Sequence, residues 1–187
     1  MSGLKVDFVV YLGDPDDGAE ALTSKDLLAV AAQHRDQLRF PDVYGAVIIS
    51  EGDKELVDRK PDPIFPLVAN LVRAVASVID GESELQQLAE SEHGFALEPN
   101  GDDVMIGMFA GDPYEPDEWL LAPQGLTMEA FGDQVLEMGR RLKGIIDAVD
   151  PEAMERDDYL KGLTEFLEVS GDALKTYKLE KQRGLRV

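Results

Sequence analysis

Alternating apolar and polar residues near the start of the chain predict a strand, a turn and a helix. Residues 4–12 carry branched or aromatic side chains at every second position, which is typical of a strand. Residues 13–18 read Gly-Asp-Pro-Asp-Asp-Gly, and this composition predicts a turn. A helix is then expected to begin near Thr23 or Ser24 and to end by Pro41.

The next segment predicts a hairpin followed by an apolar helix. Residues 43–50 and 54–58 have strand character, and the Glu-Gly-Asp sequence at residues 51–53 can turn the chain between them. A cluster of prolines marks the start of a helix over residues 64–79, whose wide apolar face predicts burial. Asp80-Gly81 is expected to end this helix.

The middle of the chain contains the clearest hairpin signal. Residues 95–98 and 103–109 have strand character, and Asn100-Gly101 between them tolerates the positive φ angles of a tight turn. A short polar helix is expected over residues 83–90, and residues 118–121 predict a further strand.

A narrow apolar seam predicts a long helix over residues 127–149. Its members recur at alternating spacings of three and four: Met128, Phe131, Val135, Met138, Leu142, Ile145 and Val149. The seam suits either a core helix or a coiled-coil dimer interface. Gly132 and Gly139 lie seven residues apart on one side, which favours close approach by another element.

Two further helices are expected at the C-terminal end. Asp150-Pro151 is a favourable pair for capping and starting a helix. The buried positions of that helix would be Tyr159, Leu163, Phe166 and Leu167. A last, basic helix is expected after Gly171.

These elements predict an α+β fold. The strands come mostly in hairpins, so we expect a mostly antiparallel sheet with helices packed on one face and a helical C-terminal part. The length fits a single domain over residues 1–187, with an α+β core at 1–150 and a helical extension at 151–187.

Composition narrows the class of protein. An apolar fraction of 44% is sufficient for a sizeable core, so the acidity does not indicate disorder. The chain has no cysteine, which excludes disulfides and thiolate metal sites. Neither a signal-peptide pattern nor a membrane-spanning segment is evident, so we expect a soluble, cytoplasmic protein with no membrane partner.

Charge is distributed unevenly along the chain. The formal net charge is -20, and no Lys or Arg occurs between Arg73 and Arg140, a stretch that holds 15 acidic residues. Basic residues gather instead at the C-terminal end: Lys175, Lys178, Lys181, Arg183 and Arg186. Such a negative region attracts cationic surfaces and repels polyanions, so nucleic-acid binding through the acidic face is not expected.

No residue pattern indicates catalysis, a cofactor or a metal. The carboxylates of residues 14–18 superficially resemble a calcium loop, but the glycine comes one position early and Lys25 stands where a glutamate ligand is required. His34 and His93 lack metal-ligand spacing, and each is interpreted as an exposed or capping histidine. Nucleophile elbows and phosphate-binding glycine loops are absent, so a non-catalytic protein without a cofactor is predicted.

The acidic middle suggests a partner-binding surface. Exposed aromatic residues ringed by charge are typical of interface hot spots, although Trp119 could equally be a core residue. The candidate partner-binding residues lie around the predicted hairpin turn, on the loop at residues 111–117 and at the start of the strand expected at 118–121: Asp102, Asp103, Asp112, Tyr114, Glu115, Asp117, Glu118 and Trp119. Alternatively, these acids belong to a generally acidic surface, as in a protein adapted to salt.

One resemblance adds to this interpretation. Its residues are the Pro-Leu-Val-Ala run from Pro66, the segments from Phe95 and Asp103, and the Thr-Met-Glu-Ala-Phe start of a long helix at Thr127. This layout, within residues 61–150, resembles that of small acidic bacterial proteins, some of them similar to the immunity proteins of polymorphic toxin systems. The resemblance implies a protein that binds and blocks a cognate toxin without catalytic residues.

The sequence therefore predicts a non-catalytic binder of a cationic protein such as a toxin or nuclease, of the immunity or inhibitor type. One alternative is a structural or adaptor subunit that docks to a neighbour, or to a second copy, through the helix at 127–149 or the basic C-terminal helix. A small hydrolase or ligand-binding protein with a site hidden from sequence inspection is a third possibility.

Overall fold

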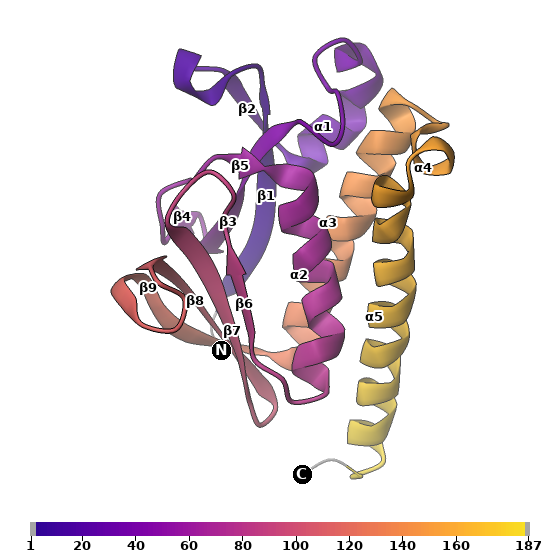
Figure 1. The fold of residues 1–187 in the computed structure, drawn as a ribbon. Helices are drawn as coiled ribbons and strands as arrows, with labels where there is room; N and C mark the ends of the chain where they lie inside the picture. The colour runs from indigo at the N-terminus through magenta and orange to yellow at the C-terminus, as the bar shows by residue number, and fades with distance from the viewer. Residues whose placement is uncertain (1–2, 186–187) are drawn as a thin grey trace.

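The computed structural model describes residues 3–185, which form two antiparallel sheets packed against three long helices. Figure 1 shows α2 (Ile64–Ile79) and α3 (Met128–Val149) beside the strands, with α5 (Asp158–Gln182) farthest from them. The α+β class, the antiparallel pairing and the helical C-terminal part are confirmed. The strands, however, divide between two sheets.

The first sheet has five strands in the order β2-β1-β3-β4, with β5 paired to β3 beside this path. Its strands are β1 (Leu4–Leu12), β2 (Glu20–Thr23), β3 (Tyr44–Glu51), β4 (Lys54–Glu55) and β5 (Asp62–Pro63). The predicted hairpin of β3 and β4 is present, although β4 is shorter than expected. The short strands β2 and β5 were not predicted, because two to four residues carry little periodicity.

The second sheet has four strands in the order β6-β7-β8-β9. They are β6 (Glu84–Gln87), β7 (His93–Asn100), β8 (Asp103–Gly111) and β9 (Pro116–Thr127). The predicted hairpin of β7 and β8 is confirmed, and its two central residues are Gly101 and Asp102, because Asn100 pairs with Asp103. Gly101 has a φ of 61°, a left-handed conformation that glycine adopts without strain.

The remaining elements are short. They comprise α1 (Ser24–Val30), α4 (Ala153–Arg156) and the 3₁₀ turns η1 (Pro15–Asp17) and η2 (Ala31–His34). The Thr23 hydroxyl caps α1 by accepting a hydrogen bond from the backbone N–H of Asp26.

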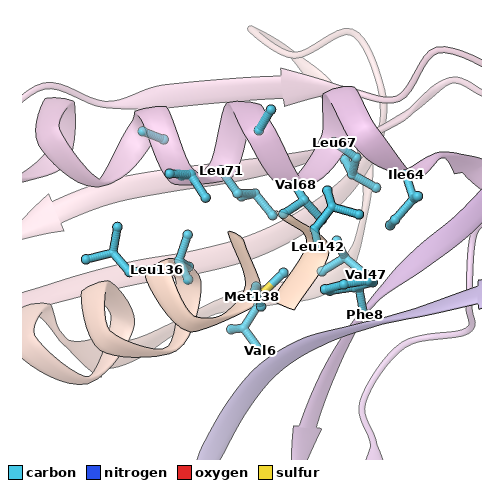
Figure 2. Close-up of a cluster of buried hydrophobic side chains, with 14 of the residues drawn as sticks. Val6, Phe8, Val47, Ile64, Leu67, Val68, Leu71, Leu136, Met138 and Leu142 are labelled. Atoms are coloured by element: carbon cyan, nitrogen blue, oxygen red, sulfur yellow. The ribbon is translucent and has the colours of Figure 1, made fainter. Parts of the chain in front are cut away.

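A continuous apolar core joins both sheets to α2, α3 and α5. Figure 2 shows Val68 and Leu71 of α2 pointing toward Met138 and Leu142 of α3, with Phe8 of β1 beneath them. Burying an apolar side chain of this size contributes about 1.5–3 kcal/mol before entropy is counted. All seven residues of the predicted seam on α3 are buried, so this chain's own core occupies the seam.

Two of the glycines in α3, Gly132 and Gly139, let neighbouring helices approach closely. A Cβ atom on Gly132 would lie 2.7 Å from the side chain of Leu174 on α5. A Cβ atom on Gly139 would lie 2.7 Å from Val72 on α2 and 2.9 Å from Leu167 on α5. The close approach expected from their spacing is therefore confirmed.

Residues 83–90 were expected to be helical, and this prediction is wrong. Residues 84–87 form β6, which pairs with β7 between Glu84↔Leu97 and Gln87↔Gly94. Leu and Gln are good helix formers, but helix propensity is a weak preference, and backbone pairing with a neighbouring strand overrides it here.

The C-terminal helices also differ from the expectation. The helix after Pro151 is the single turn α4, and the long helix α5 begins only after Asp157, whose side chain caps it. Tyr159 is 54% exposed instead of buried, whereas Leu163 is buried and Phe166 and Leu167 are partly buried.

No separate basic helix begins after Gly171, because α5 continues through that residue. The buried side chains of Ser170, Leu174 and Tyr177 hold α5 against the core on both sides of Gly171. The Ser170 hydroxyl donates a 2.6 Å hydrogen bond to the Val72 carbonyl on α2.

Within residues 3–185, no helix combines the length and apolar character needed to cross a membrane.

Candidate functional site

The β8–β9 loop displays the densest group of predicted binding residues. We use the name acidic loop for the acids and aromatics of this loop and of the adjoining start of β9: Asp112, Tyr114, Glu115, Asp117, Glu118 and Trp119. Gly111 and Pro116 pair at its base, and the Asp112 carboxylate accepts a 2.8 Å hydrogen bond from the backbone N–H of Tyr114. Tyr114 is 88% exposed at its tip. The acidic loop thus has an ordered base and an exposed aromatic residue.

Trp119 combines a packed edge with an exposed face. Its ring meets Phe109 edge to face, with 6.3 Å between the ring centroids, and it lies across Gly107, where a Cβ atom would come within 2.7 Å of the indole. Even so, the residue is 41% exposed. The sequence left open whether Trp119 is a core or a surface residue; the structure places it at the boundary, supported by Phe109 and open to solvent.

The four acids of the acidic loop carry no ion pair with any residue in the described range. The ion pairs found there involve other carboxylates, on β1, β4, β6, on the β7–β8 turn and on the helices. Unpaired surface carboxylates keep their full charge toward solvent. The negative charge expected from the sequence is therefore exposed at this loop.

Asp102 and Asp103, also predicted to bind the partner, lie at the opposite end of β8. The eight residue steps from Asp103 to Gly111 correspond to about 27 Å along an extended strand. Asp102 sits in the β7–β8 turn and Asp103 begins β8, where it pairs with Thr127. Figure 1 shows the β7–β8 turn low in the view and the loop near β9 at the left. These two acids do not share a site with the acidic loop.

Asp102 is moreover neutralised by α5. Lys181 lies 2.9 Å from the Asp102 carboxylate and 3.5 Å from the Glu129 carboxylate. The Tyr177 hydroxyl donates a 2.8 Å hydrogen bond to Asp102. Lys181 and then Tyr177 hold the pKa of Asp102 below its usual value. Lys178 pairs with Asp133 of α3 at 2.6 Å. The basic end of the chain therefore binds α5 to α3 and to the β7–β8 turn; Arg186 lies outside the described residues.

A polar cleft of about 740 Å³ opens beside the first turn of the chain and the β6–β7 loop. Its half-buried lining comes from segments far apart in the sequence, and includes Tyr11, Tyr44, Lys60, Ser91 and His93. This volume falls within the usual range for small-ligand sites. Sequence inspection missed the cleft; the only available signal was the placement of tyrosines at the ends of two predicted strands.

Two groups in the cleft have shifted pKa values with clear causes. The Tyr44 hydroxyl donates a 3.2 Å hydrogen bond to Glu90, and the negative charge of Glu90 raises the pKa of Tyr44 above its usual value. Burial, with a further contribution from the charge of Lys60, lowers the pKa of His93. His93 Nδ1 lies 2.9 Å from the Ser91 hydroxyl, while His34 is on the surface beside Gln37.

The buried Asp62 holds the β6–β7 loop, which forms one wall of this cleft. It is only 3% exposed, and its Oδ1 accepts 2.9 Å hydrogen bonds from the backbone N–H groups of Ala89 and Glu90. Burial raises the pKa of the Asp62 carboxyl against the opposing effect of these two bonds. A buried carboxylate that accepts two backbone bonds holds the β6–β7 loop in place.

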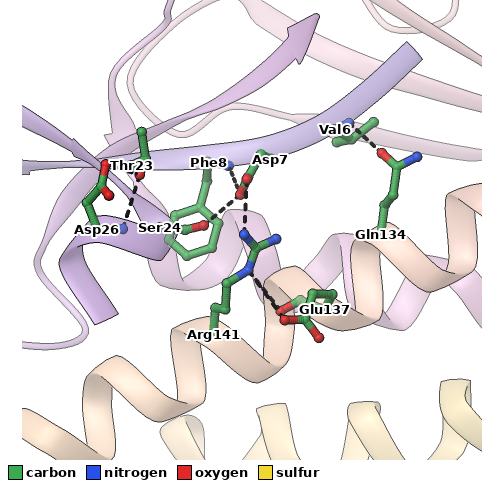
Figure 3. Close-up of polar contacts among 9 residues, drawn as sticks. All are labelled: Val6, Asp7, Phe8, Thr23, Ser24, Asp26, Gln134, Glu137 and Arg141. Carbon is green, nitrogen blue, oxygen red and sulfur yellow. Dashed lines mark hydrogen bonds and ion pairs between the residues drawn. The ribbon is translucent and has the colours of Figure 1, made fainter. Parts of the chain in front are cut away.

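A second groove, of about 570 Å³, is occupied at its edge by a polar network that joins β1 to α1 and α3. Figure 3 shows Asp7 receiving hydrogen bonds from Phe8 N–H and the Ser24 hydroxyl, while Arg141 reaches its other oxygen at 3.1 Å. All these partners lie on secondary-structure elements of the core: β1, α1 and α3. The network therefore has a structural role.

Gln134 closes the open edge of β1 beside this network. Its side-chain oxygen accepts a 2.8 Å hydrogen bond from Val6 N–H, and its amide nitrogen donates to the Leu4 carbonyl at 3.3 Å (Figure 3). The side-chain amide thus takes the place of a neighbouring strand at an edge that would otherwise be free to pair with another chain.

The arrangement offers an exposed negative loop and, next to it, a polar cleft. Among residues 3–185, no group of three or more His, Asp or Glu side chains is arranged to hold a metal ion. The Asp14 carboxylate instead caps η1 by accepting a hydrogen bond from the backbone N–H of Asp16.

Comparison with known protein families, with curated proteins and with solved structures finds no match for this chain.

Proposed function

We propose that this protein is a non-catalytic binder of a cationic protein, of the immunity or inhibitor type, and that the acidic loop is its contact surface. The observation that carries the proposal is the set of unpaired carboxylates around an exposed tyrosine and tryptophan on the β8–β9 loop. A basic partner surface would supply the missing counter-charges.

The physical argument concerns both rate and affinity. Complementary charges speed the encounter of two proteins and disfavour partners of the wrong sign. Tyr114 and Trp119 would then supply the apolar contact area, since tyrosine and tryptophan dominate the energy of many interfaces. The Phe109 ring already orients Trp119, so less side-chain freedom is lost on binding.

The alternative of docking through the helix at residues 128–149 has less support. The apolar residues of α3 pack against this chain's own core, and its Gly132 and Gly139 are covered by α2 and α5. The residues of the acidic loop, by contrast, remain accessible. The proposal therefore favours the acidic loop over the helix.

The test is affinity capture from an extract of the cells that make the protein. The loop variant carries Asp112→Asn, Glu115→Gln, Asp117→Asn and Glu118→Gln. A matched control carries Glu152→Gln, Glu155→Gln, Glu165→Gln and Glu168→Gln, which makes the same change in net charge on α5 and the segment before it.

The wild type and the control should capture the same basic protein in a stoichiometric, salt-sensitive complex, identified by mass spectrometry. The loop variant should bind it at least about tenfold more weakly. Equal capture by the loop variant would refute the acidic loop as the contact surface. Equal losses in both variants would show that only bulk charge matters.

A further inference from the structure

The cleft and the acidic loop form one continuous surface. The backbone N–H of Gly111, at the base of the acidic loop, donates a 2.7 Å hydrogen bond to the carbonyl of Glu92 in the β6–β7 loop. His93 in the cleft pairs with Ala110, which in turn pairs with Glu118 of the acidic loop. Two strand spacings, about 10 Å, therefore separate His93 from Glu118. A single partner surface can cover both features.

The interior and the rim of the cleft differ in chemistry. The interior contains the half-buried phenol rings of Tyr11 and Tyr44. The rim is exposed and mostly acidic, with carboxylates from three separate segments: Asp14, Asp16, Asp36, Asp42 and Glu90. Aromatic faces surrounded by carboxylates suit a cation with an extended apolar stem.

The cleft also contains two cations, Arg39 and Lys60, so five carboxylates exceed the bases by three charges. The raised pKa of Tyr44, caused first by Glu90 and also by Asp14 and Asp62, is consistent with a net negative field at the phenol. Lys60 lies on the His93 side, where its charge lowers the pKa of that imidazole. The position near Tyr44 and Glu90 is therefore the favourable one for a cation.

We propose that this cleft is the anchor pocket for one arginine side chain of the cationic partner, an inference that rests on the function proposed above. Arginine suits the cleft better than lysine, because its planar guanidinium can stack on a tyrosine ring while it donates two parallel hydrogen bonds to a carboxylate. Glu90 is the carboxylate that receives it, and Asp42 adds a second negative charge on the same rim. The Tyr44 hydroxyl contacts Oε1 of Glu90, and within residues 3–185 no hydrogen bond or ion pair occupies Oε2.

The test uses N-acetyl-arginine amide as the probe, titrated into the full-length protein and followed by NMR of the tyrosine, histidine and tryptophan rings. Binding of a single side chain is expected at about 1 mM, with saturable shifts at Tyr44 and His93. The citrulline analogue, which has the same shape without the charge, should bind at least about tenfold more weakly.

Three outcomes would overturn the inference: equal binding of the citrulline analogue, shifts confined to Trp119, or preferential binding of the corresponding aspartate amide. The last would mean that Arg39 and Lys60 determine the ligand and that the cleft takes an anion.

A pair of variants separates this inference from the proposed function. Asp42→Asn combined with Glu90→Gln should weaken the arginine probe at least about fivefold, while the amide that replaces the Glu90 carboxylate can still accept the Tyr44 hydrogen bond. Asp112→Asn combined with Asp117→Asn should leave the affinity for the probe unchanged while weakening capture of the partner. If the probe fails to bind but the loop variant still loses the partner, the cleft inference falls and the proposed function stands.

Discussion

The Tyr177 hydroxyl of α5 donates a 2.8 Å hydrogen bond to Asp102, in a turn 75 residues away in the sequence. Tyr177 is 2% exposed, and Lys181 lies over its ring at 5.9 Å from the centroid while pairing with the same carboxylate. One buried phenol and one lysine thus attach the C-terminal helix to the hairpin of β7 and β8.

Tyr177→Phe should lower the free energy of unfolding by about 1–2 kcal/mol, because it removes a hydrogen bond to a charged acceptor and leaves the ring in place. Urea denaturation measures the change. Tyr114→Phe is the matched control and should have no effect, since Tyr114 is 88% exposed. A Tyr177→Phe protein as stable as the wild type would show that the hydrogen bond to Asp102 contributes nothing.

Alkaline titration should show that Tyr177 ionises later than an ordinary tyrosine. Burial, followed by the hydrogen bond to Asp102, raises the pKa of Tyr177 to about 12. The folded protein therefore holds this proton more tightly than the unfolded chain, whose tyrosines have a pKa of about 10. The stability contributed by Tyr177 is complete below about pH 10 and is lost as the pH rises through about 12.

The measurement is the absorbance of phenolate near pH 12, compared between the wild type and Tyr177→Phe. The variant should lack the late step and retain the earlier ones. Loss of an early step instead would assign the shifted pKa to a different tyrosine.

Glycine-to-alanine substitutions should have opposite effects in two helices. Gly139→Ala should destabilise the protein by about 1–3 kcal/mol, because the new methyl group would press against Val72 and Leu167. Gly162→Ala on α5 meets open space, so it should stabilise the protein by roughly 0.5–1 kcal/mol through helix propensity alone. Thermal unfolding of both variants shows whether each substitution raises or lowers the stability. If both variants were more stable than the wild type, α2 and α5 could not be packed closely against α3.

Asp62 should make a pH-dependent contribution to stability. Because burial raises its folded-state pKa, its contribution is largest below the unfolded value of about 4 and falls as the pH rises through the raised folded value. Asp62→Asn keeps an oxygen for Ala89 and Glu90 but carries no charge. Relative to the wild type, this variant should therefore gain stability as the pH rises from 4 to 7.

Asp62→Ala is the complementary variant. It removes the acceptor of two partly buried backbone N–H groups and should cost about 1–3 kcal/mol at either pH. Urea unfolding curves at several pH values test both changes, with the exposed Asp53→Asn as the control. An Asn variant that behaves like the Ala variant at every pH would refute the assigned role.

The pair of Asp7 and Arg141 should couple more strongly than a surface pair. Arg141 is well shielded, and Asp7 also accepts from Ser24 and Phe8, so a double-mutant cycle with alanine should give about 1–2 kcal/mol. The half-exposed pair of Lys143 and Asp147, one helical turn apart on α3, should give about 0.5 kcal/mol or less. Equal coupling energies would remove the special role given to the Asp7 network.

Local pattern predicted the elements whose periodicity lies within a single segment. The strand β1, the helices α2 and α3 and the hairpin around Gly101 all follow from spacing and turn chemistry. The failures have one physical cause. Residues 84–87 are extended because β7 pairs with them, and α5 continues through Gly171 because Leu174 and Tyr177 pack on the core beyond it.

The candidate site divides in the same way. The exposed acids and aromatics of the β8–β9 loop follow from composition, since they lie next to one another in the sequence. The neutralisation of Asp102 depends on Lys181, and the cleft combines Tyr11, Tyr44 and His93 from three segments. Neither arrangement can be predicted from the spacing of residues along the chain, because both depend on contacts between distant segments.

The strand β8 has a consequence for the way two molecules meet. At one end Lys181 of α5 balances the Asp102 carboxylate, and at the other the carboxylates of the acidic loop have no ion pair within residues 3–185. Such an unequal distribution is an electric dipole, and a positively charged body at a distance exerts a torque on it. If the acidic loop is the contact surface proposed above, this torque would turn the acidic loop and the neighbouring cleft toward the cationic partner before contact.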